Sequence, residues 1–216
     1  MMAAVTVWGC GGSDGGDGPR AGETVELESV SGQILVKQPD EDTFATLEDA
    51  TEVPVGTEVD ASKGTVQLTS ATTDGDEQSG EFSEGAFEVV QEPETTEVTL
   101  KLTGGDFDPC KTEAAKRDKS TVGGPEIRKL FTDAEGEFRT EGQFAAAAVR
   151  GTKFETVDAC FGTLNDVEEG EVVVTDLVAD RELVLGPGDD HWSASRPAED
   201  AGAPDASPPD SGSSRY

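Results

Sequence analysis

Apart from its acids, this chain of 216 residues has few side chains that could do chemistry. It contains three cysteines, Cys10, Cys110 and Cys160, and a single histidine, His191. No His–Cys zinc set can be assembled from them, and a Ser–His–Asp or Cys–His pair would need His191, which we expect in a disordered tail. The sequence therefore predicts no catalytic residue, no metal site and no cofactor, and a protein that is not an enzyme.

The acids dominate the charge balance. Asp and Glu number 46 against 16 Lys and Arg, which gives a formal net charge of -30. Such a chain repels phosphate backbones and anionic lipid headgroups, so we expect no nucleic-acid partner. Paired carboxylates could hydrolyse a glycan, but no pair among so many acids is singled out by its spacing. A carboxylate-based envelope glycan hydrolase remains the alternative, and it predicts two acids about 5 to 10 Å apart in a cleft.

Two short segments share features with ligand-binding loops but do not match them. Residues 150–152, Arg-Gly-Thr, lack the lysine and the further glycines of a phosphate loop. Asp74 and Asp76 alternate as in a calcium loop, but the next carboxylate and the glycine at the sixth position are missing. We interpret the second segment as an exposed hairpin.

The N-terminal residues 1–22 are predicted to be part of a signal peptide followed by a flexible tether. An apolar run, Ala3–Trp8, reaches Cys10 through Gly9. This resembles the end of a bacterial lipoprotein signal, which implies cleavage after Gly9 and a lipid on Cys10 if more of the signal precedes Met1. We expect an exported protein that is anchored at the membrane by this lipid or is extracellular. The alternative is a disordered N-terminus with an incidental cysteine.

Residues 188–216 form the other predicted end segment. They are rich in Pro, Ala, Ser, Asp and Gly and contain little that could be buried. We expect a disordered acidic tail, with His191 and Trp192 at its start.

The intervening residues 23–187 have the apolar spacing of β-strands. Apolar side chains recur at every second position, and glycines between them suggest chain reversals, for example at Gly32 and Gly64. The pattern predicts an all-β compact domain of short antiparallel strands, arranged as a sandwich, a barrel or a short solenoid. The apolar pairs and triplets are Val25 and Leu27, Ile34 and Val36, Val53 and Val55, Val66 and Leu68, Phe87 and Val89, Val98, Leu100 and Leu102, Val172 and Val174, and Leu183 and Leu185.

One segment, residues 126–138, also has helical spacing, through Ile127, Leu130 and Phe131. It could hold at most two helical turns before Gly136, and a short strand is the alternative. Residues 113–119, just before it, lack an apolar face and are expected to be an exposed loop.

The alanine run that begins at residue 145 is predicted to be a strand that enters a tight corner. Arg150, Gly151, Thr152 and Phe154 form this corner: Gly151 permits the bend, Phe154 returns to the core, and Arg150 pairs with an acid. The strand would face the core with the small side chains of Ala145, Ala147 and Val149.

Cys110 and Cys160 are predicted to form a disulfide. Export favours it, and an even number of cysteines remains once Cys10 carries lipid. A loop of this length would gain about 4 kcal/mol in the chain-entropy model. The alternative is two buried free thiols.

Three segments in order resemble the FecR-like domain family. Residues 44–71 contain its "G-x-x-V" step and "G-x-V-x-L" strand, and residues 81–91 are similar to its next hairpin. Residues 146–177 contain the "V-R-G-T-x-F" corner and the "T-x-V-x-x-G-x-V-x-V" pattern that follow. The similarity covers about residues 25–187, with an insertion at about 104–142 that contains Cys110.

The resemblance implies an all-β periplasmic or extracellular domain. Such domains occur in sensors that report on an outer-membrane transporter to an anti-sigma system, and in envelope proteins without an assigned role. This chain lacks the transmembrane and anti-sigma segments of the full sensor. We therefore expect a non-enzymatic binding or scaffolding module at the cell envelope, linked to envelope signalling. It would contact an envelope protein or glycan through strand edges and hairpin loops.

Overall fold

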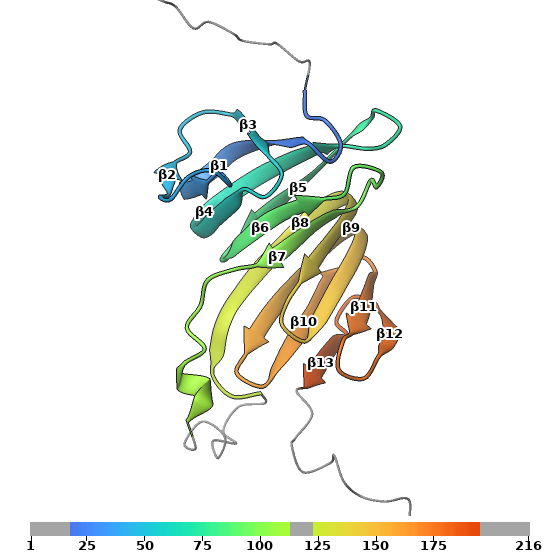
Figure 1. Ribbon diagram of the computed structural model, residues 1–216. Coiled ribbons are helices and arrows are strands. Elements are labelled where there is room, and N and C mark those ends of the chain that lie inside the picture. Colours follow the sequence, from blue (N-terminus) through green and yellow to red (C-terminus); the bar gives the residue numbers. More distant parts are fainter. Residues whose placement is uncertain (1–17, 113–122, 195–216) are drawn as a thin grey trace, which may run out of the picture.

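The computed structural model describes residues 18–112 and 123–194, apart from the side chain of Arg150, and these residues form an all-β structure (Figure 1). Thirteen strands are joined in one hydrogen-bonded network, and a short 3-10 turn at Pro109–Lys111 follows β7. No helix long and apolar enough to cross a membrane occurs in the described part. The all-β prediction is confirmed.

The strands follow one another along the chain, with a long connection between β7 and β8 that contains the 3-10 turn, and Figure 1 labels each strand. Their bounds are β1 Thr24–Lys37, β2 Ala45–Thr46, β3 Thr51–Pro54, β4 Glu58–Ala71, β5 Glu77–Ser83, β6 Ala86–Gln91, β7 Val98–Leu102, β8 Glu126–Glu141, β9 Ala145–Ala159, β10 Gly162–Glu169, β11 Val172–Asp176, β12 Arg181–Leu185 and β13 Asp190–Ala194.

Five strands close into a small barrel. Going round it, β4 pairs with β5, β5 with β8, β8 with β7, β7 with β6, and β6 again with β4. Only the β7–β8 contact in this ring is parallel. Phe82, Phe87 and Phe138 fill the interior, with the ring of Phe82 centred 5.6 Å from that of Phe87 and 5.5 Å from that of Phe138. The barrel therefore has a compact aromatic core.

Two long ladders extend the barrel in different directions (Figure 1). On one side, β1 pairs along β4 and carries β2 and β3. On the other side, β9 pairs along β8, and the two parts of β9 have different further partners. Residues 145–149 of β9 pair with β11, and residues 153–159 pair with β10. The outer strands β12 and β13 are added to β11 and β10.

The apolar residues that recur at every second position are largely buried, as predicted, but the chain reversals expected at two glycines are wrong. Gly32 and Gly64 lie inside β1 and β4 and face each other across the ladder. A Cβ atom on Gly32 would lie 2.2 Å from the carbonyl oxygen of Lys63, and one on Gly64 would lie 2.3 Å from that of Ser31. These glycines are needed for the close approach of two backbones, not for turns.

The helical alternative at residues 126–138 is also wrong. This segment belongs to β8, where Leu130, Thr132 and Ala134 are buried and the residues between them are partly exposed. The barrel offers β8 backbone partners on both sides, which outweighs a weak helical spacing. The expected insertion at about 104–142 consequently contains a central barrel strand, while residues 113–119 lie outside the described part.

The predicted disordered tail begins too early. Residues 190–194 form β13 and pair with β10. Trp192 explains the order, because its ring lies where side chains on Gly123 and Gly162 would be, 1.8 Å and 2.2 Å from their ideal Cβ positions. Two glycines thus make room for one indole, which is partly buried against them and so favours the strand. Residues 195–216 lie outside the described part.

The segment around Gly151 continues as strand. Ala145, Ala147 and Val149 are buried on one side of β9, and Phe154 is fully buried. Gly151 has a φ of 75°, and the β8–β9 register shifts between Ala134 and Glu137, opposite it. Two residues of β8, Glu135 and Gly136, therefore face the single residue Gly151, so the irregularity is a β-bulge of β8. Strand β9 continues through Gly151 and does not turn a corner there.

Cys110 and Cys160 form a disulfide, with their Cα atoms 5.1 Å apart. It joins the 3-10 turn after β7 to the end of β9. Both cysteines are buried, so the bond lies within the folded domain.

Two glycine substitutions should differ in their cost. Gly64→Ala forces two backbones apart, and we expect it to lower the free energy of unfolding by about 3 kcal/mol. Gly151→Ala meets no atom within 4 Å and pays only for its positive φ, about 1 to 2 kcal/mol. Urea denaturation measures both, and Gly151→Asn is the control, because Asn tolerates this conformation better than Ala. Equal losses for the two alanine variants would contradict this account.

Candidate functional site

The residues singled out by the sequence do not meet at one site. Cys10 lies outside the described residues, and Cys110 and Cys160 are used in the disulfide. Thr152 is buried beside the bulge at Gly151, and the side chain of Arg150 is outside the described part. Among the described residues, no group of three or more His, Cys, Asp or Glu side chains is placed to hold a metal ion.

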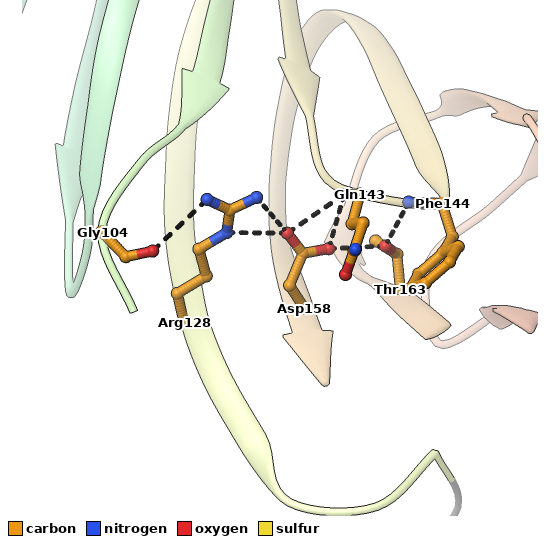
Figure 2. Close-up of polar contacts among 6 residues, drawn as sticks. All are labelled: Gly104, Arg128, Gln143, Phe144, Asp158 and Thr163. Carbon is orange, nitrogen blue, oxygen red and sulfur yellow. Dashed lines mark hydrogen bonds and ion pairs between the residues drawn. The ribbon is translucent and has the colours of Figure 1, made fainter. Parts of the chain in front are cut away.

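A buried carboxylate on β9 organises one end of the domain (Figure 2). Asp158 is fully buried, and the guanidinium of Arg128 on β8 donates to its Oδ2 through Nε and Nη2, both at 2.8 Å. The backbone N–H of Gln143 donates to both oxygens at 2.9 and 3.1 Å, and the hydroxyl of Thr163 donates to Oδ1 at 2.5 Å. The hydroxyl of Thr163 in turn accepts the N–H of Phe144 at 3.0 Å. Every carboxylate oxygen is thus hydrogen-bonded.

Arg128 connects this carboxylate to the segment that follows β7. Its Nη1 donates to the carbonyl of Gly104 at 3.4 Å, and its guanidinium lies 5.3 Å from the centre of the Phe107 ring. Arg128 therefore ties β8, β9 and this connection together (Figure 2). We interpret the cluster as structural, because both oxygens of this carboxylate already accept hydrogen bonds inside the protein and its charge is paired with that of Arg128.

The single histidine also pairs with a buried acid, which the sequence reasoning missed. His191 Nε2 on β13 lies 3.1 Å from Oδ2 of Asp176 at the end of β11. Burial by itself raises the pKa of Asp176, but N–H donation from Ala179, the contact with His191 and N–H donation from Val178 outweigh it and lower the pKa. The alternation of His191 and Ser193 around Trp192 in the sequence was the signal for a strand here.

With Ser193 and His191 on β13 and Asp176 on β11, the structure contains a Ser–His–Asp set of residue types, but it lacks the geometry of a triad. Its hydroxyl is fully buried and has no hydrogen-bond partner. His191 Nε2 is directed at Asp176 instead. A serine nucleophile must be hydrogen-bonded to its base and reachable by substrate, and Ser193 is neither.

An open groove lies on the outer face of β8, β9 and β11. Its volume is about 410 Å³, and one arginine, Arg139, lines it together with four glutamates. Glu97, Glu171 and Glu182 make no ion pair with a described residue. The lining residues are Glu97, Glu137, Arg139, Ala148, Val149, Glu171, Val173, Thr175 and Glu182. Glu137 is opposite Arg150 in the β8–β9 register. The groove is acidic and open to solvent.

Strand β12 borders this groove and has β11 as its one partner among the described strands. Val184 on β12 is 62% exposed, and Leu177 in the β11–β12 turn is 50% exposed. Val184 is opposite Val173, which lines the groove. We take the groove together with β12 as the candidate functional site and name it the β12 edge site.

Removing one partner of the buried pair should be costly, and an exposed arginine provides a matched control. Arg128→Met leaves the Asp158 charge buried without its cation, and we expect a loss of about 3 to 5 kcal/mol in the free energy of unfolding. Arg181→Met removes an arginine that is 55% exposed and 3.9 Å from Asp176, and should cost about 1 kcal/mol or less. Urea denaturation measures both. Adding Asp158→Asn to Arg128→Met should restore part of the loss, and similar losses for the two arginines would contradict the prediction.

Asp176 should make stability depend on pH in the acid range. Its pKa is lower in the folded than in the unfolded chain, so its contribution is complete above the unfolded value of about 4 and is lost as the pH falls through the folded value. Asp176→Asn should therefore be destabilising at pH 6, and the difference from the parent chain should shrink below pH 4 or so. Urea midpoints at several pH values test this. The exposed Asp42→Asn is the control, and a difference that does not change with pH would contradict the prediction.

Comparison of the chain with protein-family models, with curated proteins and with solved structures found no match in any of the three.

Proposed function

We propose that this chain is an exported, non-enzymatic binding or scaffolding module of the cell envelope, held there by a lipid on Cys10. The observation that carries the binding function is the β12 edge site, a strand edge that no other described strand pairs with, which has an exposed valine beside an open groove. Strand edges bind partners by adding a strand, because their backbone donors and acceptors are already aligned.

Export is supported by the disulfide between Cys110 and Cys160, because such bonds persist in oxidising compartments. The net charge of -30 is compatible with a protein that stays soluble outside the cytoplasm. The resemblance to FecR-like domains agrees with this location and suggests a link to envelope signalling. The partner would be an envelope protein or glycan.

We propose that the protein is not an enzyme because its described buried acids are hydrogen-bonded inside the protein and lie away from the groove. Asp158 and Asp176 are the buried carboxylates of the described residues, and both are hydrogen-bonded inside the protein. Neither lines the groove. A general acid needs a carboxyl group in apolar surroundings that faces the substrate.

The alternative, an envelope glycan hydrolase, is favoured by one observation. Four glutamates line the same open groove, and a hydrolase needs two of them on either side of a sugar. No aromatic side chain is among the residues that line the groove, although such side chains commonly stack on sugars. A binding module is therefore the better-supported function.

Capture of envelope components by the immobilised full-length protein tests the proposal. We expect Val184→Asp, which places a charge on the β12 edge, to abolish capture of the specific component. Val30→Asp is the matched control, because Val30 is 49% exposed on β1 and distant in strand order. Capture that survives Val184→Asp, or is lost equally in both variants, would overturn the site. Release of sugar reducing ends that is lost in Glu171→Gln or Glu182→Gln would instead favour the hydrolase.

A further inference from the structure

The β12 edge site has features that specify the chemistry of its partner. We propose that β12 accepts an extended segment of a partner protein in which basic and apolar residues alternate, added as a further strand of the sheet. This inference rests on the proposed function, since it names the ligand class of the same site.

Among the described residues, one edge of the β12 backbone has no strand paired with it and could accept such an addition. Four described strands, β2, β3, β12 and β13, have one ladder partner each. Strand β2 has two residues, and β3 has four and ends in Pro54. Strand β13 begins with an aspartate, Asp190. Strand β12 has five residues, contains no proline, and its register with β11 has no shift. Shortness, proline, charge and bulges are the usual protections of an edge. Strands β12 and β13 are of equal length, lack proline and are paired without a shift, and both begin with charged residues, Arg181 and Glu182 in β12 and Asp190 in β13. Of these two strands, β12 is the one that borders the groove.

The side chains of β12 favour a partner with two different faces. Leu183 is partly exposed and Leu185 is buried, and both lie on the side of the strand that faces the interior. Glu182 and Val184 lie on the other side, towards the groove. Because side chains alternate along a strand, an added segment would place apolar residues beside Leu183 and Leu185 and its other residues beside Glu182 and Val184.

The charge of the groove indicates which residues of the added segment would lie beside Glu182 and Val184. Glu182, Glu171 and Glu97 have no ion-pair partner among the described residues, and Arg139 is the one described cation that lines the groove. A lysine or arginine opposite Glu182 would form a cross-strand ion pair, and its aliphatic stem would cover Val184. The net charge of -30 would also speed the encounter with a basic segment and disfavour a second copy of this chain.

The test uses a fluorescently labelled heptapeptide of alternating lysine and valine with the full-length protein, and measures Kd by anisotropy at fixed ionic strength. The matched variants are Glu182→Lys and Glu28→Lys, which change the net charge equally. Glu28 is exposed on β1, far from β12 in strand order. We expect Glu182→Lys to weaken binding about tenfold, because an attraction becomes a repulsion. Glu28→Lys should change Kd less than about twofold.

Two further peptides separate strand addition from general charge attraction. The same heptapeptide with N-methyl groups on alternate amides keeps its charge but loses the hydrogen-bond donors of one of its two edges. We expect no binding by the methylated peptide whose blocked edge is the one that would pair with β12. Two methylated peptides are tested, one with the odd-numbered amides blocked and one with the even-numbered amides blocked. Binding of both methylated peptides as tightly as the parent, or equal effects of Glu182→Lys and Glu28→Lys, would overturn the proposal.

A heptapeptide of alternating threonine and valine distinguishes this inference from the proposed function. If this peptide binds as tightly as the lysine peptide and its binding is lost in Val184→Asp, the proposal of a basic partner is wrong, while the β12 edge remains a binding site. If no peptide binds but capture of an envelope component still depends on Val184, strand addition is wrong and the binding module stands. If neither peptide binding nor capture depends on Val184, both fail.

Discussion

The ladder between β8 and β9 is the interaction on which the rest of this structure depends. Strand β8 closes the barrel, because it pairs with β5 at one part of its length and with β7 at another. Strand β9 carries everything outside the barrel on that side, through its separate pairings with β10 and β11. One two-stranded ladder therefore connects the aromatic core of the barrel to the edge strand that we propose as the binding surface. The bulge of β8 lies opposite Gly151, where β9 passes from one set of neighbours to the other.

The charged groups inside this structure stabilise the connections between strands. Asp158 holds β8, β9, β10 and the segment before β9 together, and Asp176 links the β11–β12 turn to β13. Each acid accepts hydrogen bonds from elements that are distant in the sequence. A buried charge contributes to a specific arrangement only when its partners are complete, and both are well supplied. The other acids of the described residues are exposed or partly exposed, and four glutamates among them give the groove its charge.

Much of the fold could be predicted from the residues, and the errors have a common cause. Period-two spacing correctly identified Val25, Leu100 and Val174 as buried strand residues. Gly32 and Gly64 were wrongly assigned to turns, because a glycine that permits close backbone contact has the same sequence appearance as one that permits a reversal. The strand at residues 126–141 was ambiguous because its partners β5, β7 and β9 are not visible in its own sequence.

The sequence by itself determined the all-β class, the excess of acid, and the small set of residues available for chemistry. These depend on composition and on local spacing, which need no knowledge of the neighbours. Only the tertiary structure decided that residues 190–194 form β13, that His191 contacts Asp176, and that β12 is an edge of the described sheet beside four glutamates. Strand order and register are set by contacts between residues far apart in the chain, and such contacts leave no periodic signal in the sequence.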